Sequence, residues 1–307
     1  MQQNRKVRWA IIVLKSLLGF ALFFISACLV FDHLVQFRMR DAELRSFFST
    51  ENVPVRIRYY DAEGRKMRYI SVGDERLPAL LFIHGSPSSL SIYKNYYKDS
   101  LFLKTFHILA VDRPGYGYSG FGNKEPSIEK QARMIKPILD TLHALQRPVL
   151  ISSGSYGTSI ACRLVMDNPG MIDGMVLVAP SLAPGEERLF WFTHAVESPL
   201  VNWFIPRMLQ VANAEKVHHQ EELEKMLPFW PNIKIPIIYI QGEKDELIDT
   251  SNASFARRHL VHAPYLEINM IKGRKHFLAF DEHLLISRKI MELYRRVKDA
   301  PRLKHFN

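Results

Sequence analysis

The residues best suited to catalysis lie in the pentapeptide SGSYG at positions 153–157, between an apolar run and a helical pattern. Ser155 at its centre could act as a nucleophile if the chain turns sharply from strand to helix, a turn that strains the serine backbone. Strand and helix can approach only if the residues two before and two after are small, as Ser153 and Gly157 are. Ser153 itself fails this requirement, because Ile151 lies two positions before it. The pattern therefore predicts Ser155 as the nucleophile.

A serine hydroxyl needs a base to remove its proton, and the base needs a carboxylate to orient it. Asp245 and His276 each follow a late apolar run of the strand type. We therefore expect them at the carboxyl ends of strands, as the acid and the base. Asp249 and His283 are the fallback residues, although His283 is better placed to begin the last helix. Three other histidines are interpreted as structural or pocket-lining: His84, His218 and His219.

A tetrahedral intermediate also needs two N–H donors aimed at its oxyanion. The Tyr156 N–H, at the start of a helix, and the Ser86 N–H, on the loop HGSP after the third apolar run, are the predicted donors. This chemistry needs no metal or organic cofactor. The two cysteines, Cys28 and Cys162, have no metal-ligand spacing, so no metal site is expected.

Apolar runs of the strand type alternate with helical patterns from residue 53 onward, which predicts an α/β fold with a mostly parallel sheet and helices on both faces. The first two runs flank a tight turn at 61–64, which predicts an antiparallel edge. The expected strands are 53–60, 67–72, 79–83, 107–111, 149–152, 175–179, 236–240 and 266–270. The expected helices are 92–103, 128–145, 158–167, 251–259 and 284–297.

Residues 181–235 interrupt this alternation with 55 residues that contain no clear strand. They are rich in Phe, Trp, Leu, Met and Pro, as in the segments 189–192, 203–206 and 226–230. So long an insertion in an α/β chain is usually functional. We interpret it as a small helical cap over the carboxyl ends of the strands, within one domain that runs from residue 53 to 307.

The N-terminal segment 1–31 predicts a membrane anchor, because Trp9–Phe31 is apolar apart from Lys15 and long enough to span a bilayer. Basic residues before the segment favour a cytoplasmic N-terminus, with the catalytic domain on the extracytoplasmic side. Residues 32–52 are expected to form a helical connector. Two alternatives stay open: a cleaved secretory signal, and a lipoprotein anchored through Cys28, since Ile25–Cys28 resembles a bacterial lipobox.

The formal net charge of +10 is compatible with nucleic acid or with an anionic membrane. No nucleic-acid-binding motif is present in the sequence, so we expect a membrane partner and no nucleic acid. A basic cluster between Arg288 and Lys304 is either part of the membrane-facing surface or a solvated helix face. The hydrophobic fraction of 47% is enough for a sizeable core.

With these motifs in this order, the region from Val53 to Lys298 resembles the capped, single-domain members of the α/β-hydrolase superfamily. The most specific match is the octapeptide DRPGYGYS at 112–119, which resembles the family's loop after the fourth strand. The resemblance implies that Ser155 is the nucleophile, Asp245 the acid and His276 the base, with the HGSP loop contributing to the oxyanion hole.

Two positions depart from the family pattern: Ser153 begins the pentapeptide in place of Gly, and Lys275 precedes the histidine where the family often has Gly. The nucleophile candidate is Ser rather than Asp, which argues against a haloalkane dehalogenase or an epoxide hydrolase.

The expected activity is hydrolysis of carboxylic esters through an acyl-enzyme, on small-molecule substrates that are apolar or lipid-like. The same fold serves peptidases, thioesterases, C–C bond hydrolases and acyltransferases, which stay open as alternatives. The alternative outside enzymes is a binding module that kept the fold and lost the chemistry. The presence of all three predicted triad residues and of the oxyanion loop argues against it.

Overall fold

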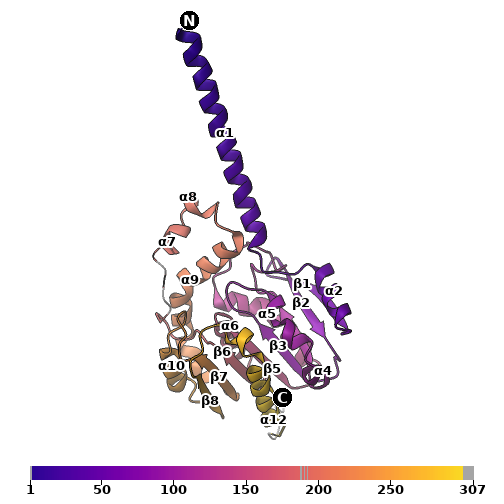
Figure 1. The fold of residues 1–307 in the computed structure, drawn as a ribbon. Coiled ribbons are helices and arrows are strands. Elements are labelled where there is room, and N and C mark those ends of the chain that lie inside the picture. Colours follow the sequence, from indigo (N-terminus) through magenta and orange to yellow (C-terminus); the bar gives the residue numbers. More distant parts are fainter. Residues whose placement is uncertain (1, 187–188, 190, 192, 300–307) are drawn as a thin grey trace.

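The protein is described from a computed structural model, which covers residues 2–186, 189, 191 and 193–299 (Figure 1). Its centre is one eight-stranded sheet with the order β1-β2-β4-β3-β5-β6-β7-β8. The pairs β1–β2 and β2–β4 are antiparallel, and the five pairs from β4–β3 to β7–β8 are parallel. The predicted α/β class, with a mostly parallel sheet and an antiparallel edge, is confirmed.

The strands lie close to the expected runs. They are β1 (Val55–Ala62), β2 (Arg65–Val72), β3 (Ala79–Ile83), β4 (His107–Val111), β5 (Val149–Gly154), β6 (Gly174–Val178), β7 (Ile237–Gly242) and β8 (Leu266–Ile271). The first turn is shorter than predicted. Only Glu63 and Gly64 separate β1 from β2, because both adopt positive φ, the conformation of a two-residue hairpin turn.

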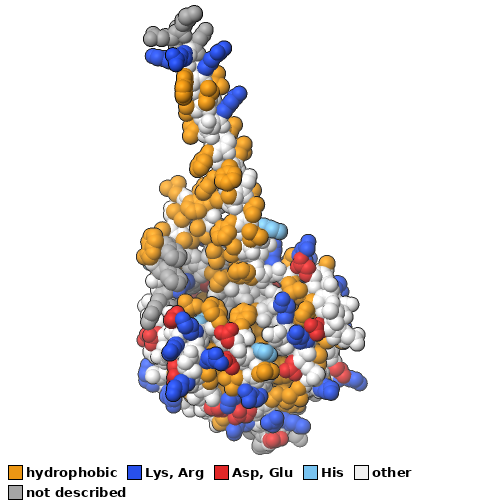
Figure 2. Space-filling model, in the orientation of Figure 1, with side chains coloured by type: hydrophobic (Ala, Val, Ile, Leu, Met, Phe, Trp, Pro, Cys, Tyr) orange, Lys and Arg blue, Asp and Glu red, His pale blue; other side chains and the backbone are white. Residues whose placement is uncertain are grey.

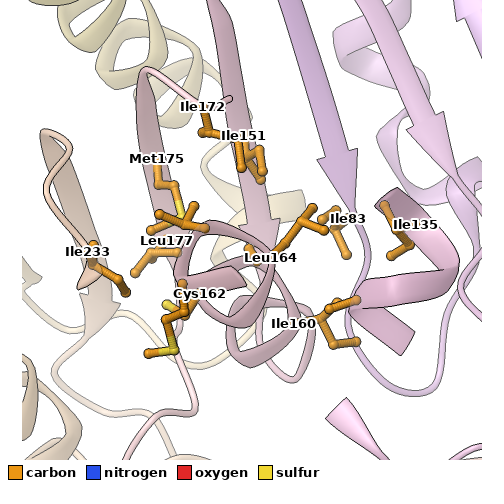
Figure 3. Close-up of a cluster of buried hydrophobic side chains, with 14 of the residues drawn as sticks. Ile83, Ile135, Ile151, Ile160, Cys162, Leu164, Ile172, Met175, Leu177 and Ile233 are labelled. Atoms are coloured by element: carbon orange, nitrogen blue, oxygen red, sulfur yellow. The ribbon is translucent and has the colours of Figure 1, made fainter. Parts of the chain in front are cut away.

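Helices cover both faces of the sheet, and the alternation of side chains along β3 shows why. Leu81 and Ile83 pack into one cluster with residues of α5 (Ile128–His143), α6 (Gly157–Asp167) and α10 (Ser251–His259). Figure 3 shows part of this cluster, with Ile83 near Ile135 of α5 and Ile160 of α6. Leu80 and Phe82 pack into the other cluster, which includes residues of α2 (Asp41–Thr50) and α12 (His283–Asp299). Successive side chains of a strand point to opposite faces, so a strand buried on both faces is a continuous apolar run.

Two helix predictions were wrong in their extent. The expected helix 92–103 is three short pieces: η1 (Leu90–Tyr93), α3 (Lys94–Tyr97) and α4 (Ser100–Thr105). The Asp99 carboxylate accepts hydrogen bonds from the Leu101 and Phe102 N–H groups and so begins a new helix there. The connector 32–52 is helical only in α2 and in the end of the N-terminal helix.

Residues 181–235 hold α7 (Thr193–Val196), α8 (Pro199–Asn202), α9 (Arg207–Met226) and η2 (Leu227–Asn232), with no strand among those described. Phe190 and Phe192 of the aromatic segment lie outside the described residues. In Figure 1, α7 and α8 lie beside the base of the N-terminal helix.

The N-terminal helix α1 (Gln2–Leu34) projects from the domain (Figure 1). Its segment Arg5–Leu34 is long and apolar enough to cross a membrane, and its side chains are not buried in the protein. At the other end of the chain, α11 (Leu278–Asp281) precedes α12, which carries the basic residues from Arg288 to Lys298. Arg302 and Lys304 of that cluster lie outside the described residues.

Candidate active site

Ser155 occupies the turn between β5 and α6, with a positive φ of 49°. Such a backbone conformation is strained for a residue with a side chain and presents the hydroxyl beyond the strand end. Gly157 permits the turn, because a Cβ at this position would lie 2.5 Å from the His84 carbonyl oxygen. Ser153 is buried, and its hydroxyl has no hydrogen-bond partner within the described part of the chain. Position 157 therefore requires glycine, whereas position 153 accommodates a small side chain.

Hydrogen bonds join Ser155, His276 and Asp245 into one chain. The Ser155 Oγ lies 3.0 Å from His276 Nε2, and His276 Nδ1 lies 2.9 Å from Asp245 Oδ2 and 3.1 Å from Oδ1. The Asp245 side chain is fully buried, whereas the His276 side chain keeps about a tenth of its surface exposed. A proton on Nδ1, donated to the carboxylate, leaves Nε2 free to accept the Ser155 proton.

The Asp245 carboxylate is held from its other side by the backbone. Its Oδ1 accepts hydrogen bonds of 3.0 Å from the N–H groups of Leu247 and Ile248. The fallback acid Asp249 instead accepts from the Ser251 N–H at the start of α10. The fallback base His283 begins α12, where its ring packs against Tyr96. The structure thus brings together the first-choice acid and base and leaves the fallback residues elsewhere.

Ser86 lies on the loop that faces Ser155, and both residues line the same cavity. Within the described residues, the Ser86 N–H donates to no protein acceptor. Tyr156 is the N-cap residue of helix α6, so its N–H lies at the N-terminal end of that helix. A Cβ at Gly85 would lie 3.0 Å from the Ser155 Cβ, so glycine lets this loop pass close to the nucleophile.

His84 fixes the base of this loop and takes no part in the triad. Its Nδ1–H donates to the Gly85 carbonyl at 2.8 Å, and its Nε2 accepts the Arg113 N–H at 3.0 Å. Burial, reinforced by the Arg113 charge, holds the pKa of His84 well below its usual 6.5. His84 is therefore neutral and structural. In the cap, His218 bonds to the Ala214 carbonyl, and His219 to the Ser159 hydroxyl.

Glu215 on α9 is an important residue that the sequence reasoning missed. Its carboxylate lies 2.6 Å from Arg113 Nη1, and both side chains are fully buried. Glu215 also accepts a 2.7 Å hydrogen bond from Tyr116 OH, which in turn accepts one from the Ser86 hydroxyl. The cap helix is thereby connected to the predicted oxyanion loop. The available signal was the arginine of the DRPGYGYS motif, which needs a buried carboxylate partner.

The first residue of that motif, Asp112, holds the loop in shape. Its buried carboxylate pairs with Arg68 at 2.7 Å and accepts the N–H groups of Leu90 and Tyr118 at 2.9 Å each. Gly117 must lack a side chain, because a Cβ there would overlap the Asp112 carboxylate. Asp112 therefore supports the loop beside the site, and it does not itself line the cavity.

A cavity of about 1190 Å³ opens above Ser155 and His276. Its lining includes the catalytic loops, residues 91–94, the segment Phe277–Phe280 near α11, and the segment that leads from α1 to α2. The last part contributes these residues: His33, Leu34, Gln36, Phe37, Arg38, Met39 and Arg40. The residues expected to be only a connector therefore form a wall of the pocket. Among the described residues, no group of His, Cys, Asp and Glu could hold a metal ion.

Sheet order, the strained serine turn and the Ser–His–Asp chain of hydrogen bonds are features typical of the α/β-hydrolase fold. The sequence model of the α/β hydrolase fold matches residues 78–200. Many solved structures of esterases, lipases and related enzymes share the fold, and with the match over residues 78–200 they support a place for this chain in the α/β-hydrolase superfamily.

Individual relatives are distant. An uncharacterized hydrolase of Saccharomyces cerevisiae is 26% identical over 194 residues, which are 60% of this chain and 66% of that protein. Mouse epoxide hydrolase 3 is 28% identical over 117 residues, 38% of this chain and 31% of that protein. The chain thus matches less than two thirds of the length of these curated relatives.

Among solved structures, a membrane phospholipase A described as a bacterial virulence factor aligns with 96% of this chain and 100% of its own, at a TM-score of 0.64. The two sequences are 17% identical, so this likeness concerns the fold.

Proposed function

We propose that the protein is a membrane-attached serine hydrolase that cleaves carboxylic esters through an acyl-enzyme. The observation that carries this proposal is the continuous chain of hydrogen bonds from Ser155 Oγ through His276 to Asp245. A nucleophile, a base and an orienting carboxylate within hydrogen-bond reach are what acyl transfer requires. Epoxide hydrolysis is not the reaction proposed for this chain, because the nucleophile candidate here, Ser155, is a hydroxyl rather than a carboxylate.

In this mechanism the Ser155 Oγ attacks the ester carbonyl carbon while His276 Nε2 takes the hydroxyl proton. The oxyanion forms beside the Ser86 and Tyr156 N–H groups, which stabilise it. Collapse of the intermediate breaks the ester C–O bond, and His276 returns the proton to the departing alcohol. Water then attacks the acyl-enzyme with His276 as base, and the acid is released.

The proposed substrates are esters with a long apolar part. The cavity is large, and Phe37, Phe277 and Phe280 line it together with Leu34 and Leu247. The fold is shared with a protein described as a membrane phospholipase A, which is consistent with a lipid-like ester. A panel of esters of increasing chain length, with peptides and thioesters beside it, would separate this proposal from the other reactions that the fold serves.

We further propose that α1 anchors the protein as a single membrane span, in line with the division into an anchor (1–31), a connector (32–52) and a capped hydrolase domain (53–307). Arg5, Lys6 and Arg8 precede the apolar segment and favour a cytoplasmic N-terminus, which leaves the domain on the extracytoplasmic side. The exposed apolar side chains of α1 support burial in lipid.

The nucleophile is tested by Ser155→Ala, with Ser153→Ala as the matched control. Ser155→Ala should abolish labelling by a fluorophosphonate probe and lower ester turnover by several orders of magnitude, without changing the thermal unfolding temperature by more than a few degrees. Ser153→Ala should keep both labelling and turnover, because that hydroxyl has no hydrogen-bond partner within the described residues. Full labelling of the Ser155→Ala protein would refute the assignment.

The anchor is tested by the mass of the mature chain and by its behaviour in membranes. An uncleaved anchor predicts a mass that includes the residues before Cys28, and a protein that stays in the membrane pellet after a high-salt wash. A lipoprotein would instead begin at Cys28 with added acyl groups, and Cys28→Ala would block its maturation. An unmodified chain that begins just after Ala27 and is found in the soluble fraction would contradict both membrane readings.

A further inference from the structure

The cap carries an apolar surface, the cap tip, formed by the exposed side chains of Leu200 and Trp203 and by the half-buried Phe204. Leu200 is 82% exposed and Trp203 is 57% exposed. The surrounding segment from 199 to 206 contains no charged residue. Its one amide side chain, Asn202, donates to the Val196 carbonyl at 2.9 Å and so has a protein partner. A cluster of this kind is unusual on a surface that faces only water.

The cap tip touches the N-terminal helix well inside its apolar segment. The Phe24 ring lies 6.0 Å from the Trp203 ring and 6.4 Å from the Phe204 ring, both edge-on. A second contact fixes the base of α1 to the cap. The Asp32 carboxylate accepts the Arg207 N–H at 2.7 Å and pairs with the Arg207 guanidinium at 2.7 Å. The helix α1 therefore contacts both the cap tip, through Phe24, and the start of α9, through Asp32.

The position of Phe24 along α1 gives the depth of this contact in a bilayer. Trp9–Phe31 has 23 residues, about 35 Å of helix at 1.5 Å per residue. A hydrocarbon core is about 30 Å thick, so about 5 Å of this segment extends beyond it. Phe24 precedes Phe31 by seven residues, or about 10 Å. Phe24 thus lies roughly 5–10 Å inside the hydrocarbon boundary, and so do the aromatic rings that touch it.

We propose that the cap tip is embedded in the acyl-chain layer of the membrane that α1 spans, as a second membrane contact. The proposal rests on the anchor role of α1. Figure 2 shows apolar side chains that continue from α1 onto the neighbouring surface, while charged side chains gather farther down the body on the face shown. Trp and Phe on a surface are well suited to such insertion, whereas the cost of desolvating charge keeps the body outside.

This embedding sets where the pocket opens. The segment from His33 to Arg40, which lines the cavity, begins two residues after Phe31, where the apolar segment ends, and so lies at headgroup depth. Phe37 and Leu34 give this wall apolar side chains, and Arg38 and Arg40 give it charge. An ester in the adjoining leaflet would reach Ser155 from the lipid side without crossing bulk water.

Depth-dependent quenching tests the embedding directly. A fluorophore is attached at Leu200→Cys in the full chain carrying Cys28→Ala, since the remaining Cys162 is fully buried. The protein is reconstituted into phosphatidylcholine vesicles with or without bromine on the acyl chains. The matched control is Val261→Cys, which is 65% exposed and follows α10, away from α1 in Figure 1. Brominated lipid should quench the Leu200→Cys label at least about twofold and leave the control unchanged, given insertion of several ångströms.

The outcomes separate the cap tip from the anchor. If alkaline carbonate leaves the protein in the vesicles and the Leu200→Cys label is not quenched, the embedded cap tip is refuted while the anchor stands. If carbonate releases the protein, the anchor is refuted, and the embedding of the cap tip is refuted with it. Both readouts are independent of ester hydrolysis, so a failure of the proposed activity does not affect them.

A charge placed in the cap tip gives a second, functional measurement. Leu200→Glu should lower hydrolysis of an ester carried in vesicles by at least about fivefold, because a carboxylate is costly in the hydrocarbon layer. Hydrolysis of a short water-soluble ester should stay within about twofold of the unmodified protein, since Leu200 does not line the cavity. Val261→Glu should change neither rate. Equal effects of Leu200→Glu on both esters would refute a membrane role for the cap tip.

Discussion

Replacing Asp245 by Asn tests the orientation of the catalytic base with almost no change in shape. The new side chain must place an oxygen and an NH₂ group where two carboxylate oxygens were. Asp245 Oδ1 accepts two backbone N–H groups, from Leu247 and Ile248. An NH₂ in that position would leave both N–H groups facing a donor, at a cost of about 1–3 kcal/mol for each lost partner. The amide oxygen therefore takes the Oδ1 position.

The NH₂ group of Asp245→Asn then faces His276 Nδ1, where Asp245 Oδ2 lies at 2.9 Å. A donor at this point requires Nδ1 to accept, which moves the imidazole proton to Nε2. The ring can then no longer take the Ser155 proton across the 3.0 Å contact. Loss of the correct tautomer in a Ser–His–Asp site lowers kcat by about 10⁴-fold, or about 5.4 kcal/mol in the activation free energy.

The assay compares kcat on a water-soluble ester for Asp245→Asn and Asp249→Asn, with thermal unfolding as a check on folding. Asp249→Asn should lose less than about threefold, because Asn also accepts the Ser251 N–H at the start of α10. Similar small losses in both variants would show that Asp245 does not orient the base. If Asp245→Asn lowers both kcat and the unfolding temperature strongly, the role of Asp245 is structural instead.

Three further results are expected. Glu215→Gln should lower the free energy of unfolding by about 3 kcal/mol in denaturant titrations, because it leaves the buried Arg113 charge without its counter-charge. Gly157→Ala should destabilise the fold by at least about 2 kcal/mol and abolish probe labelling, because its Cβ would meet the His84 carbonyl. The free energy of unfolding should fall as the pH drops below 6.5, by up to about 1.4 kcal/mol per pH unit. The reason is that the lowered pKa of buried His84 keeps it neutral in the folded protein, while the same histidine takes up a proton in the unfolded chain. A stability that does not fall between pH 6.5 and 5 would contradict that state of His84.

Most of the fold could be predicted because its signals are local. A run such as Ala79–Ile83 is apolar on both faces, and the strand has those same bounds in the structure. The helix 92–103 could not be predicted in the same way. Its apolar spacing is helical, but a single carboxylate at Asp99 begins a new helix and divides it. Capping by one side chain competes with periodicity and leaves little trace in composition.

The proximity of Ser155, Asp245 and His276 followed from their positions after strands of one parallel sheet, which meet at one edge. The partner of Arg113 could not be found that way. Glu215 lies 102 residues later on a helix whose sequence is mostly polar, and nothing local distinguishes it from the exposed glutamates around it. The role of residues 33–40 as a pocket wall was equally hidden, because it depends on where α1 meets the domain.

The buried contacts of α9 also have a consequence for the motion of the cap. Lifting α9 from the body would separate Glu215 from Arg113 and remove the Glu222 carboxylate from the Ile128 N–H, which it accepts at 2.8 Å. Both contacts would have to break together, which opposes the motion and favours the closed position of α9. On this argument α9 stays in place during turnover rather than moving as a hinged lid. Substrate would then enter through an opening of the cavity that is always present. Because no opening step precedes binding, hydrolysis should begin without a lag when vesicles are added to the enzyme.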